Sequence, residues 1–298
     1  MKRAFLKIAI AGGVLLLLGG LAFVIAMTAV GWDFSVLNTD YEKKIATYSA
    51  EEVNEIVADL STEDVYFLPS EDDEITVEYF VVKNKRGKVL REIVPTLSDG
   101  VLRCVEKKKK YNLTVIDYHS YKVVVKAPAD KVFALSVKLS TGNVTLGEEG
   151  KERRLSSLKV SASTGDVNLK GKTICEGDLT LSVSTGDIRF KGETRCDGKV
   201  SVKASTSMIS VNAPLSAKEI KINASTGDVS CAAPLSFDSL DVSVSTGDVS
   251  LLLAGKKELY TYLYRVDTGS SNVESFALGS KKVNVRTTTG DIRVRFEE

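Results

Sequence analysis

One aspartate position recurs through the second half of the chain and could do chemistry as a set. Each member follows a Ser-Thr-Gly or Thr-Thr-Gly phrase, and the series is interrupted only by Met208 and Ser270. If these residues stack about 5 Å apart, their oxygens could bind Ca²⁺. The phrase nevertheless lacks the spacing of calcium-binding β-solenoids, and each carboxylate can instead cap a turn. We therefore expect structural turn residues and no metal site at Asp166, Asp187, Asp228, Asp248 and Asp291.

Acidic residues also suit a polysaccharide hydrolase or lyase, and parallel β-solenoids host such enzymes. Here the acids recur at turns, where the repeat itself explains them, and Arg189 and Lys203 occupy outward strand positions. His119 is the only histidine, and we expect it to be exposed and non-catalytic. No phosphate-binding glycine loop, zinc spacing or dinucleotide fingerprint is present. The sequence predicts no catalytic residue and no cofactor, so we expect no enzyme, with the hydrolase or lyase as the competing hypothesis.

Two of the four cysteines sit at equivalent places in the repeat. Cys175 and Cys196 each lie ten residues after a repeated glycine, and their flanking residues match. Stacking would put their Cα atoms about 5 Å apart, inside the usual disulfide range of about 4.4–6.8 Å. We expect them to be neighbours and leave the covalent bond open, because stacked side chains can point in parallel. Cys104 and Cys231 should be free thiols, with Cys231 in the core.

The elements that position these residues follow from an internal repeat with a period of about 21 residues. Its phrase is LSTGNV at Leu139, ASTGDV at Ala162 and VSTGDI at Val183, and it continues to TTTGDI at Thr287. Glycine allows a positive φ at a tight corner, so the shared slot predicts structural turns. This slot is occupied by Gly142, Gly165, Gly186, Ser207, Gly227, Gly247, Gly269 and Gly290.

Apolar residues alternate on both sides of the glycine slot. Around Gly186 they are Leu179, Leu181, Val183, Ile188 and Phe190. Such alternation predicts two short strands with one buried face, joined by a corner at Ser-Thr-Gly-Asp. Units of this kind bury their apolar faces by stacking about 4.8 Å apart, so we expect an all-β, parallel β-solenoid, right-handed by default. The alternative, a β-sandwich of hairpins with STGD turns, fits strict in-phase repetition less well.

The order of the repeat weakens toward the N-terminus. Residues 59–67 read as a divergent rung with Glu63 in the glycine slot. Residues 75–94 suggest longer strands or a hairpin, and the lysines at 107–110 suggest a solvated edge that blocks strand pairing. We therefore divide the β-rich part into an irregular region, 51–120, and a regular STGD-repeat solenoid, 121–298.

The first thirty residues predict one transmembrane helix. Residues 8–30 carry no charge, and 23 helical residues are long enough to span a bilayer core of about 30 Å. A cleaved signal peptide is the alternative, although its apolar region is usually only about 7–15 residues long. Lys2, Arg3 and Lys7 place the N-terminus in the cytoplasm by the positive-inside rule. Residues 31–50 would be a linker or a short amphipathic juxtamembrane segment, leaving the rest of the chain outside the cell.

Composition limits the classes of partner. The chain has 298 residues with 40 basic and 39 acidic side chains, a net charge of +1, so no general attraction for nucleic acid is expected. The expected partners are the lipid bilayer, through residues 8–30, and an envelope protein or glycan that the sequence does not name.

A family resemblance is carried by YKVVVKAPADKVFALSVKLSTGNVTL from Tyr121 and the serial STGD phrases that follow it. The chain resembles the toastrack-like family of bacterial "putative adhesins", a domain of unknown function. The resemblance covers about residues 53–298, with 121–251 the most specific part; Ser207, Met208 and the rung from Asp267 depart from it. It implies a β-solenoid at the cell envelope, with relatives among envelope-stress proteins of Gram-positive bacteria. We expect an adhesin-like binding module or an envelope structural module.

Overall fold

The computed structural model describes residues 2–29, 32, 39–85, 87–107 and 121–297. The chain divides into two compact units. The first contains residues 1–43, 80–92 and 107–119, and the second contains residues 44–79, 93–106 and 120–298. His119 and the lysines at 108–110, which the sequence places on an exposed surface, lie outside the described residues.

The first unit contains helix α1 (Lys2–Ala29), and its side chains are described from Gly12 onward. Within the described residues, no helix meets the length and hydropathy that a bilayer crossing requires. The expected linker, 31–50, includes strand β1 (Thr39–Ser49) and the 3₁₀ turn η2 (Ala50–Glu52). The sequence does not predict strand β1, because Asp, Glu and Lys interrupt its apolar residues.

An antiparallel hairpin joins β4 (Glu74–Asn84) to β5 (Val89–Ser98), and its tip belongs to the first unit. Strand β5 then pairs antiparallel with β6 (Val101–Glu106) inside the second unit. The sequence suggests either longer strands or a hairpin between residues 75 and 94, and the structure has two long strands that pair as a hairpin.

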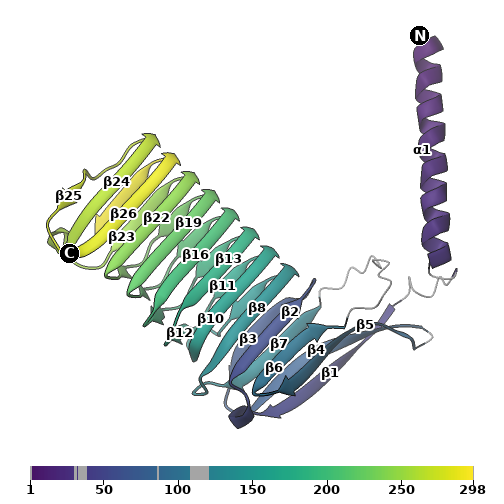
Figure 1. Cartoon of the computed structure of the whole chain (residues 1–298), viewed down its shortest axis with the longest axis horizontal. Coiled ribbons are helices and arrows are strands. Elements are labelled where there is room, and N and C mark those ends of the chain that lie inside the picture. The colour runs from purple at the N-terminus through teal and green to yellow at the C-terminus, as the bar shows by residue number, and fades with distance from the viewer. Residues whose placement is uncertain (1, 30–31, 33–38, 86, 108–120, 298) are drawn as a thin grey trace. The chain divides into compact units, whose positions relative to one another are not determined.

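The second unit is a parallel β-solenoid with three stacks of strands, here called faces A, B and C. Face A is formed by the strands that precede the corners, and after β6 each of its strands runs parallel to the next. Figure 1 shows these strands as a ladder. In spatial order, the strands that follow β6 on face A are β2 (Glu55–Leu60), β8 (Phe133–Thr141), β10 (Glu152–Thr164), β13 (Leu179–Thr185), β16 (Lys199–Thr206), β19 (Glu219–Thr226), β22 (Ser239–Thr246), β26 (Lys281–Thr289) and β24 (Tyr260–Thr268).

Face B follows each Ser-Thr-Gly corner and is also parallel. Its strands are β7 (Lys122–Pro128), β3 (Asp64–Ser70), β9 (Val144–Leu146), β11 (Val167–Leu169), β14 (Ile188–Phe190), β17 (Ile209–Val211), β20 (Val229–Cys231), β23 (Val249–Leu253) and β27 (Ile292–Phe296). Faces A and B are the two strands per repeat that the alternation predicts.

Face C is formed by a third strand in the central repeats, which the alternation of apolar residues does not predict. It contains the first residues of β10 and four strands of two to four residues: β12 (Lys172–Cys175), β15 (Thr194–Cys196), β18 (Leu215–Ser216) and β21 (Leu235–Ser236). Strands this short carry only one or two inward side chains, so they leave no detectable period.

The core lies between the three faces and repeats from rung to rung. Leu181, Val202, Ile222, Val242 and Val285 occupy one register position on face A, and each is 0% exposed. Their backbone partners shift by 20 or 21 residues between adjacent rungs as far as β22, which confirms the predicted period.

The rung order changes at the C-terminal end. Strand β22 pairs with β26, 43 residues later, and β24 lies outside β26 with the pairing Tyr262 to Val283. The last rung of the sequence is thus inserted between the two rungs that precede it (Figure 1). The turn η3 (Lys257–Leu259) leads into β24, and β25 (Phe276–Ala277) pairs antiparallel with β24. Because the spacing of the repeat is the same in either order, the sequence alone cannot reveal this inversion.

Candidate functional site

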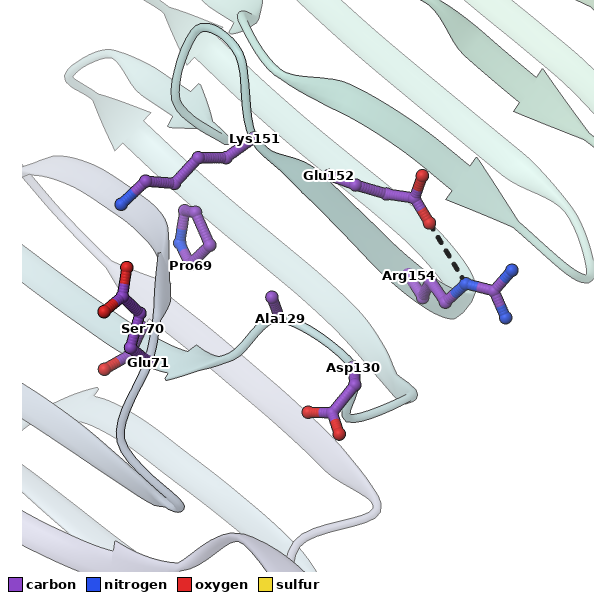
Figure 2. A pocket seen from close by; sticks show the side chains of 8 residues that line it. All are labelled: Pro69, Ser70, Glu71, Ala129, Asp130, Lys151, Glu152 and Arg154. Carbon is purple, nitrogen blue, oxygen red and sulfur yellow. Dashed lines mark hydrogen bonds and ion pairs between the residues drawn. The ribbon is translucent and has the colours of Figure 1, made fainter.

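The first shallow depression of the solenoid has a volume of about 410 Å³ and lies beside the start of β10 (Figure 2). Glu152 there accepts hydrogen bonds or ion pairs from Lys172 Nζ at 3.1 Å and Arg154 Nε at 3.2 Å. Lys172 first, and then Arg154, hold the pKa of Glu152 below its usual range. A general acid at neutral pH needs the opposite shift, so this environment does not favour Glu152 in that role.

The second depression, of about 450 Å³, runs along face C between β15 and β21. Its charges include Arg195 and Asp197, which form an ion pair at 3.3 Å. The floor contains Phe237, which is 3% exposed. Three acidic residues line each depression, but among the described residues no three His, Cys, Asp or Glu side chains are placed to hold a metal ion.

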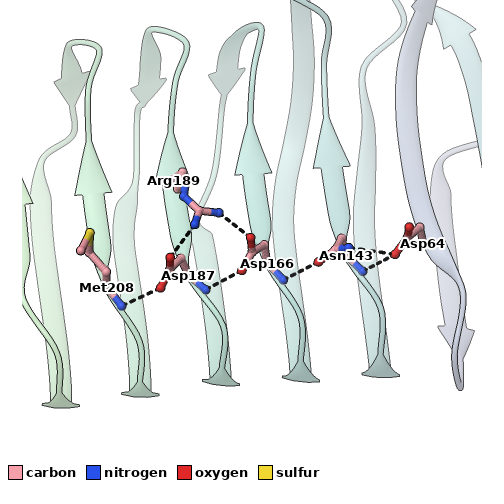
Figure 3. Close-up of polar contacts among 6 residues, drawn as sticks. All are labelled: Asp64, Asn143, Asp166, Asp187, Arg189 and Met208. Carbon is pink, nitrogen blue, oxygen red and sulfur yellow. Dashed lines mark hydrogen bonds and ion pairs between the residues drawn. The ribbon is translucent and has the colours of Figure 1, made fainter.

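The aspartates of the repeat form a hydrogen-bonded column along the corner between faces A and B. Figure 3 shows its first half. The backbone N–H of Asp187 donates to Oδ1 of Asp166 at 2.8 Å, and the N–H of Asp166 donates to Oδ1 of Asn143 at 2.8 Å. At the N-terminal end, Asn143 N–H donates to Asp64 in the same way, at 2.8 Å. Each side chain therefore caps the next rung, rather than its own turn as the sequence suggested.

The column continues toward the C-terminus with one interruption. Asp248 N–H donates to Asp228 Oδ1 at 2.8 Å, Asp291 N–H to Asp248 at 2.9 Å, and Ser270 N–H to Asp291 at 2.9 Å. The interruption is Met208, whose N–H donates to Asp187 at 2.9 Å but whose thioether offers no such acceptor to the next rung. Among the described residues, the N–H of Asp228 accordingly has no hydrogen-bond acceptor.

Arg189 neutralises two carboxylates of this column. Its guanidinium forms ion pairs with Asp166 and Asp187 on adjacent rungs (Figure 3). Partial burial of Asp166 opposes ionisation, but the Asp187 N–H and the Arg189 cation outweigh it, and the pKa of Asp166 lies below its usual value. The carboxylates are thus engaged with protein donors, which explains the column without a bound cation.

The glycines before the aspartates fix the corner. Gly186 and Gly227 have φ values of +124° and +126°, and all seven glycines of the slot have positive φ. A Cβ on Gly227 would lie 2.0 Å from the carbonyl oxygen of Ser207 in the preceding rung. Glycine is therefore required for backbone conformation and for close stacking. Ser207 occupies the slot without a positive φ, and its buried hydroxyl has no hydrogen-bond partner in the described structure.

A column of exposed threonines runs beside the aspartates. The residue before each corner glycine is threonine, and these residues are register partners from rung to rung. All eight are exposed: Thr141, Thr164, Thr185, Thr206, Thr226, Thr246, Thr289 and Thr268 in spatial order. Adjacent strands lie about 4.8 Å apart, so the column presents evenly spaced hydroxyl and methyl groups on one edge of the solenoid.

Cys175 and Cys196 are register partners on face C, as their spacing predicts, but both are free thiols. Cys196 Sγ donates to the Gly177 carbonyl at 3.0 Å, and Cys175 Sγ donates to the Asp178 carbonyl at 3.5 Å. The two thiols also contact each other, and this contact raises the pKa of Cys175 and lowers that of Cys196. Cys104 and Cys231 are also buried free thiols, and burial raises the pKa of each to about 12.

The β-rich part of the chain that follows strand β1 matches one family model. The match covers residues 53–195 and 192–298 and is described as Toastrack DUF4097. The chain belongs to this toastrack family. The family resemblance carried by the repeated phrases is thus confirmed.

Solved structures share the fold at low sequence identity. A "putative lipid binding protein" from Parabacteroides distasonis aligns with a TM-score of 0.53 and 13% identity, covering 87% of this chain and 98% of the other. A "putative adhesin" from Parabacteroides merdae aligns with a TM-score of 0.50 and 15% identity, covering 87% and 97%. No curated protein shows significant similarity to the chain.

Proposed function

We propose that this toastrack protein is a membrane-anchored, adhesin-like module whose threonine edge binds an envelope protein or a glycan outside the cell. The observation that carries the proposal is the column of eight exposed threonines in register. Hydroxyl groups both donate and accept hydrogen bonds, and the regular spacing suits an extended ligand.

The aspartate column supports this proposal because it makes the edge rigid. Except between the rungs of Met208 and Asp228, each corner is tied to the next through a side-chain acceptor, which holds the threonines at fixed separations before any ligand binds. A preorganised surface avoids part of the entropic cost of binding. The names of the two structural neighbours, a "putative adhesin" and a "putative lipid binding protein", are consistent with a binding role.

The membrane anchor is part of the same proposal. Helix α1 ends at Ala29 and so contains residues 8–29 of the apolar stretch, and Trp32, which follows it, is 50% exposed. An aromatic residue at this place suits the interface between lipid and water. In this proposal the N-terminus is cytoplasmic and the solenoid is extracellular.

Binding of the full chain to isolated cell envelopes tests whether the threonine edge binds an envelope ligand. In the variant Thr206→Arg/Thr226→Arg, two large charged side chains interrupt the threonine column at exposed positions. Binding of this variant to envelopes should fall at least roughly tenfold. The matched control is Ser216→Arg/Ser236→Arg, which changes two stacked hydroxyls on face C. Equal binding by the threonine variant and the control would refute the role of the edge.

A polysaccharide lyase or hydrolase is the alternative to a binding module. In our proposal the purified chain binds such polymers without cleaving them, because the acids of the repeat are engaged with rung-to-rung N–H donors and with Arg189. Release of reducing or unsaturated ends from a cell-wall or plant polysaccharide, abolished by replacing one acidic residue, would establish the enzyme instead.

A further inference from the structure

The near-zero net charge of the chain conceals a separation of charge between its two units. The first unit contains 13 Lys and Arg residues and 5 Asp and Glu residues, a net charge of +8. The second unit contains 27 Lys and Arg residues and 34 Asp and Glu residues, a net charge of −7. Cations are thus concentrated in the unit that holds the N-terminal helix. Lys2, Arg3 and Lys7 account for only three of the 13.

The β4–β5 hairpin presents part of this charge at a defined tip. Lys85 and Lys88 are both exposed there, on either side of the turn. Among the described residues, neither ammonium group forms an ion pair. Lys83, lower on the hairpin, pairs with Glu42 at 2.6 Å and is partly neutralised. Lys107 is exposed as well, and its N–H donates to the carbonyl of Glu92 on β5, which places it beside the same hairpin.

Hydrogen bonds join the two ends of the tip. Asn84 is 2% exposed, and its Oδ1 accepts the N–H of Lys88 at 2.9 Å. The backbone N–H of Asn84 donates to the Lys88 carbonyl at 2.9 Å, and Gly87 has a φ of +76°. A turn closed in this way displays its lysines without further ordering.

The length of the connecting chain limits how far the hairpin can lie from the end of the helix. Tyr41 on β1 packs edge-to-face on Phe80 at the base of the hairpin, with ring centroids 5.8 Å apart. Only 11 residues separate Tyr41 from Ala29, the last residue of α1. An extended chain covers at most about 3.6 Å per residue, so the base of the hairpin lies within about 45 Å of the helix end. If the helix is in a membrane, the basic tip can reach the lipid surface.

We propose that the basic tip of the β4–β5 hairpin, at Lys85 and Lys88, binds the phosphate headgroups of anionic phospholipids in the membrane that holds α1. The inference rests on the proposed membrane anchor. Basic residues near an anionic surface each favour contact by roughly fivefold, and the attraction extends over a Debye length of about 8 Å at physiological salt. Contact of this kind would hold the hairpin flat on the bilayer and give the anchored chain a second attachment point.

Hydrogen–deuterium exchange of the full chain in nanodiscs tests the proposal. Peptides from residues 80–92 should exchange at least roughly fivefold more slowly in phosphatidylglycerol than in phosphatidylcholine discs, and 0.5 M salt, at about 4 Å screening length, should remove the difference. Lys85→Glu/Lys88→Glu should also remove it. The control Lys159→Glu/Lys203→Glu makes the same charge change at two exposed lysines of the solenoid and should preserve it.

The exchange of α1 in the same samples separates the two proposals. A protected helix with a hairpin that exchanges equally in both lipids would overturn the hairpin inference and leave the anchor intact. An unprotected helix in both lipids would overturn the anchor, and the inference with it. A lipid difference that survives in Lys85→Glu/Lys88→Glu would also overturn the assignment to these lysines.

Discussion

At the scale of single residues, the corner glycines serve two purposes that one comparison can separate. Gly227 has a positive φ, and a Cβ there would meet the Ser207 carbonyl at 2.0 Å. Gly150 also has a positive φ, +78°, but nothing lies within 4 Å of a Cβ at that position. Comparing substitutions at Gly227 and Gly150 therefore separates the cost of a positive φ from the cost of a steric clash between rungs.

Gly227→Ala should destabilise the solenoid by about 3 kcal/mol, whereas Gly150→Ala should cost only about 1 kcal/mol. Urea denaturation of both variants measures the two free energies of unfolding. Equal losses would show that close approach between rungs contributes nothing to the requirement for glycine.

Met208 marks the place where the aspartate column lacks an acceptor. Met208→Asn supplies a neutral amide oxygen for the N–H of Asp228, as Asn143 does for Asp166, without adding a carboxylate beside Asp187. We expect a gain in stability of at most about 1 kcal/mol, because the Asp228 N–H can bond to water at present. Thermal unfolding of Met208→Asn and of the control Met208→Ala measures this gain. If Met208→Asn is no more stable than Met208→Ala, the added amide oxygen does not act as an acceptor.

Asp166 makes part of the stability dependent on pH. Its pKa in the folded state is depressed, so the stabilisation is complete above the unfolded value of about 3.9 and is lost as pH falls through the folded value. Asp166→Asn retains an acceptor for the Asp187 N–H but cannot titrate. The melting temperature of the native chain should fall more steeply than that of the variant below about pH 4. If the melting temperatures of the two proteins fall in parallel with pH, the Asp166 carboxylate does not contribute to the pH dependence of stability.

At the scale of elements, the sequence predicts the strands that flank the corner and misses those that carry few apolar residues. The rung around Gly186 was predictable because Leu179, Leu181 and Val183 alternate before it, and these residues are buried. Strand β15 contains three residues, of which only Thr194 and Cys196 point inward, so it has no period to detect.

The contribution of Arg153 could not be predicted from the sequence either. It is 2% exposed, and its guanidinium donates to the carbonyls of Pro128, Leu68 and Ala127 at 2.7–2.8 Å. Burial lowers its pKa to about 10, so the group remains charged at neutral pH. It joins β3, β7 and β10 where the irregular rungs meet the regular ones, and a basic residue in a strand otherwise indicates solvent exposure.

The candidate site was predictable in part. The turn residues Gly186 and Asp187 follow from the repeated phrase, but the direction of the cap, from one rung to the next, requires the stacking register. The free state of Cys175 depends on side-chain direction, which the spacing leaves undetermined.

At the scale of the whole molecule, the membrane anchor makes a topological prediction. In intact cells, an external protease should remove a tag placed after the C-terminal residue, because the solenoid follows a helix whose N-terminal flank is basic. A tag placed before Met1 should be protected until the cells are lysed. Protection of the C-terminal tag in intact cells would refute the topology.

The central claim is that successive corners stack in a parallel register, with the last two rungs inverted. Continuous-wave electron paramagnetic resonance of paired nitroxides on cysteines introduced at the exposed threonine column tests it most directly. Labels at 206 and 226, and at 246 and 289, should lie on adjacent rungs about 5 Å apart and broaden each other strongly. Labels at 246 and 268 should lie two rungs apart and interact weakly. Strong coupling between 246 and 268 would contradict the inversion, and no coupling between 206 and 226 would contradict the solenoid itself.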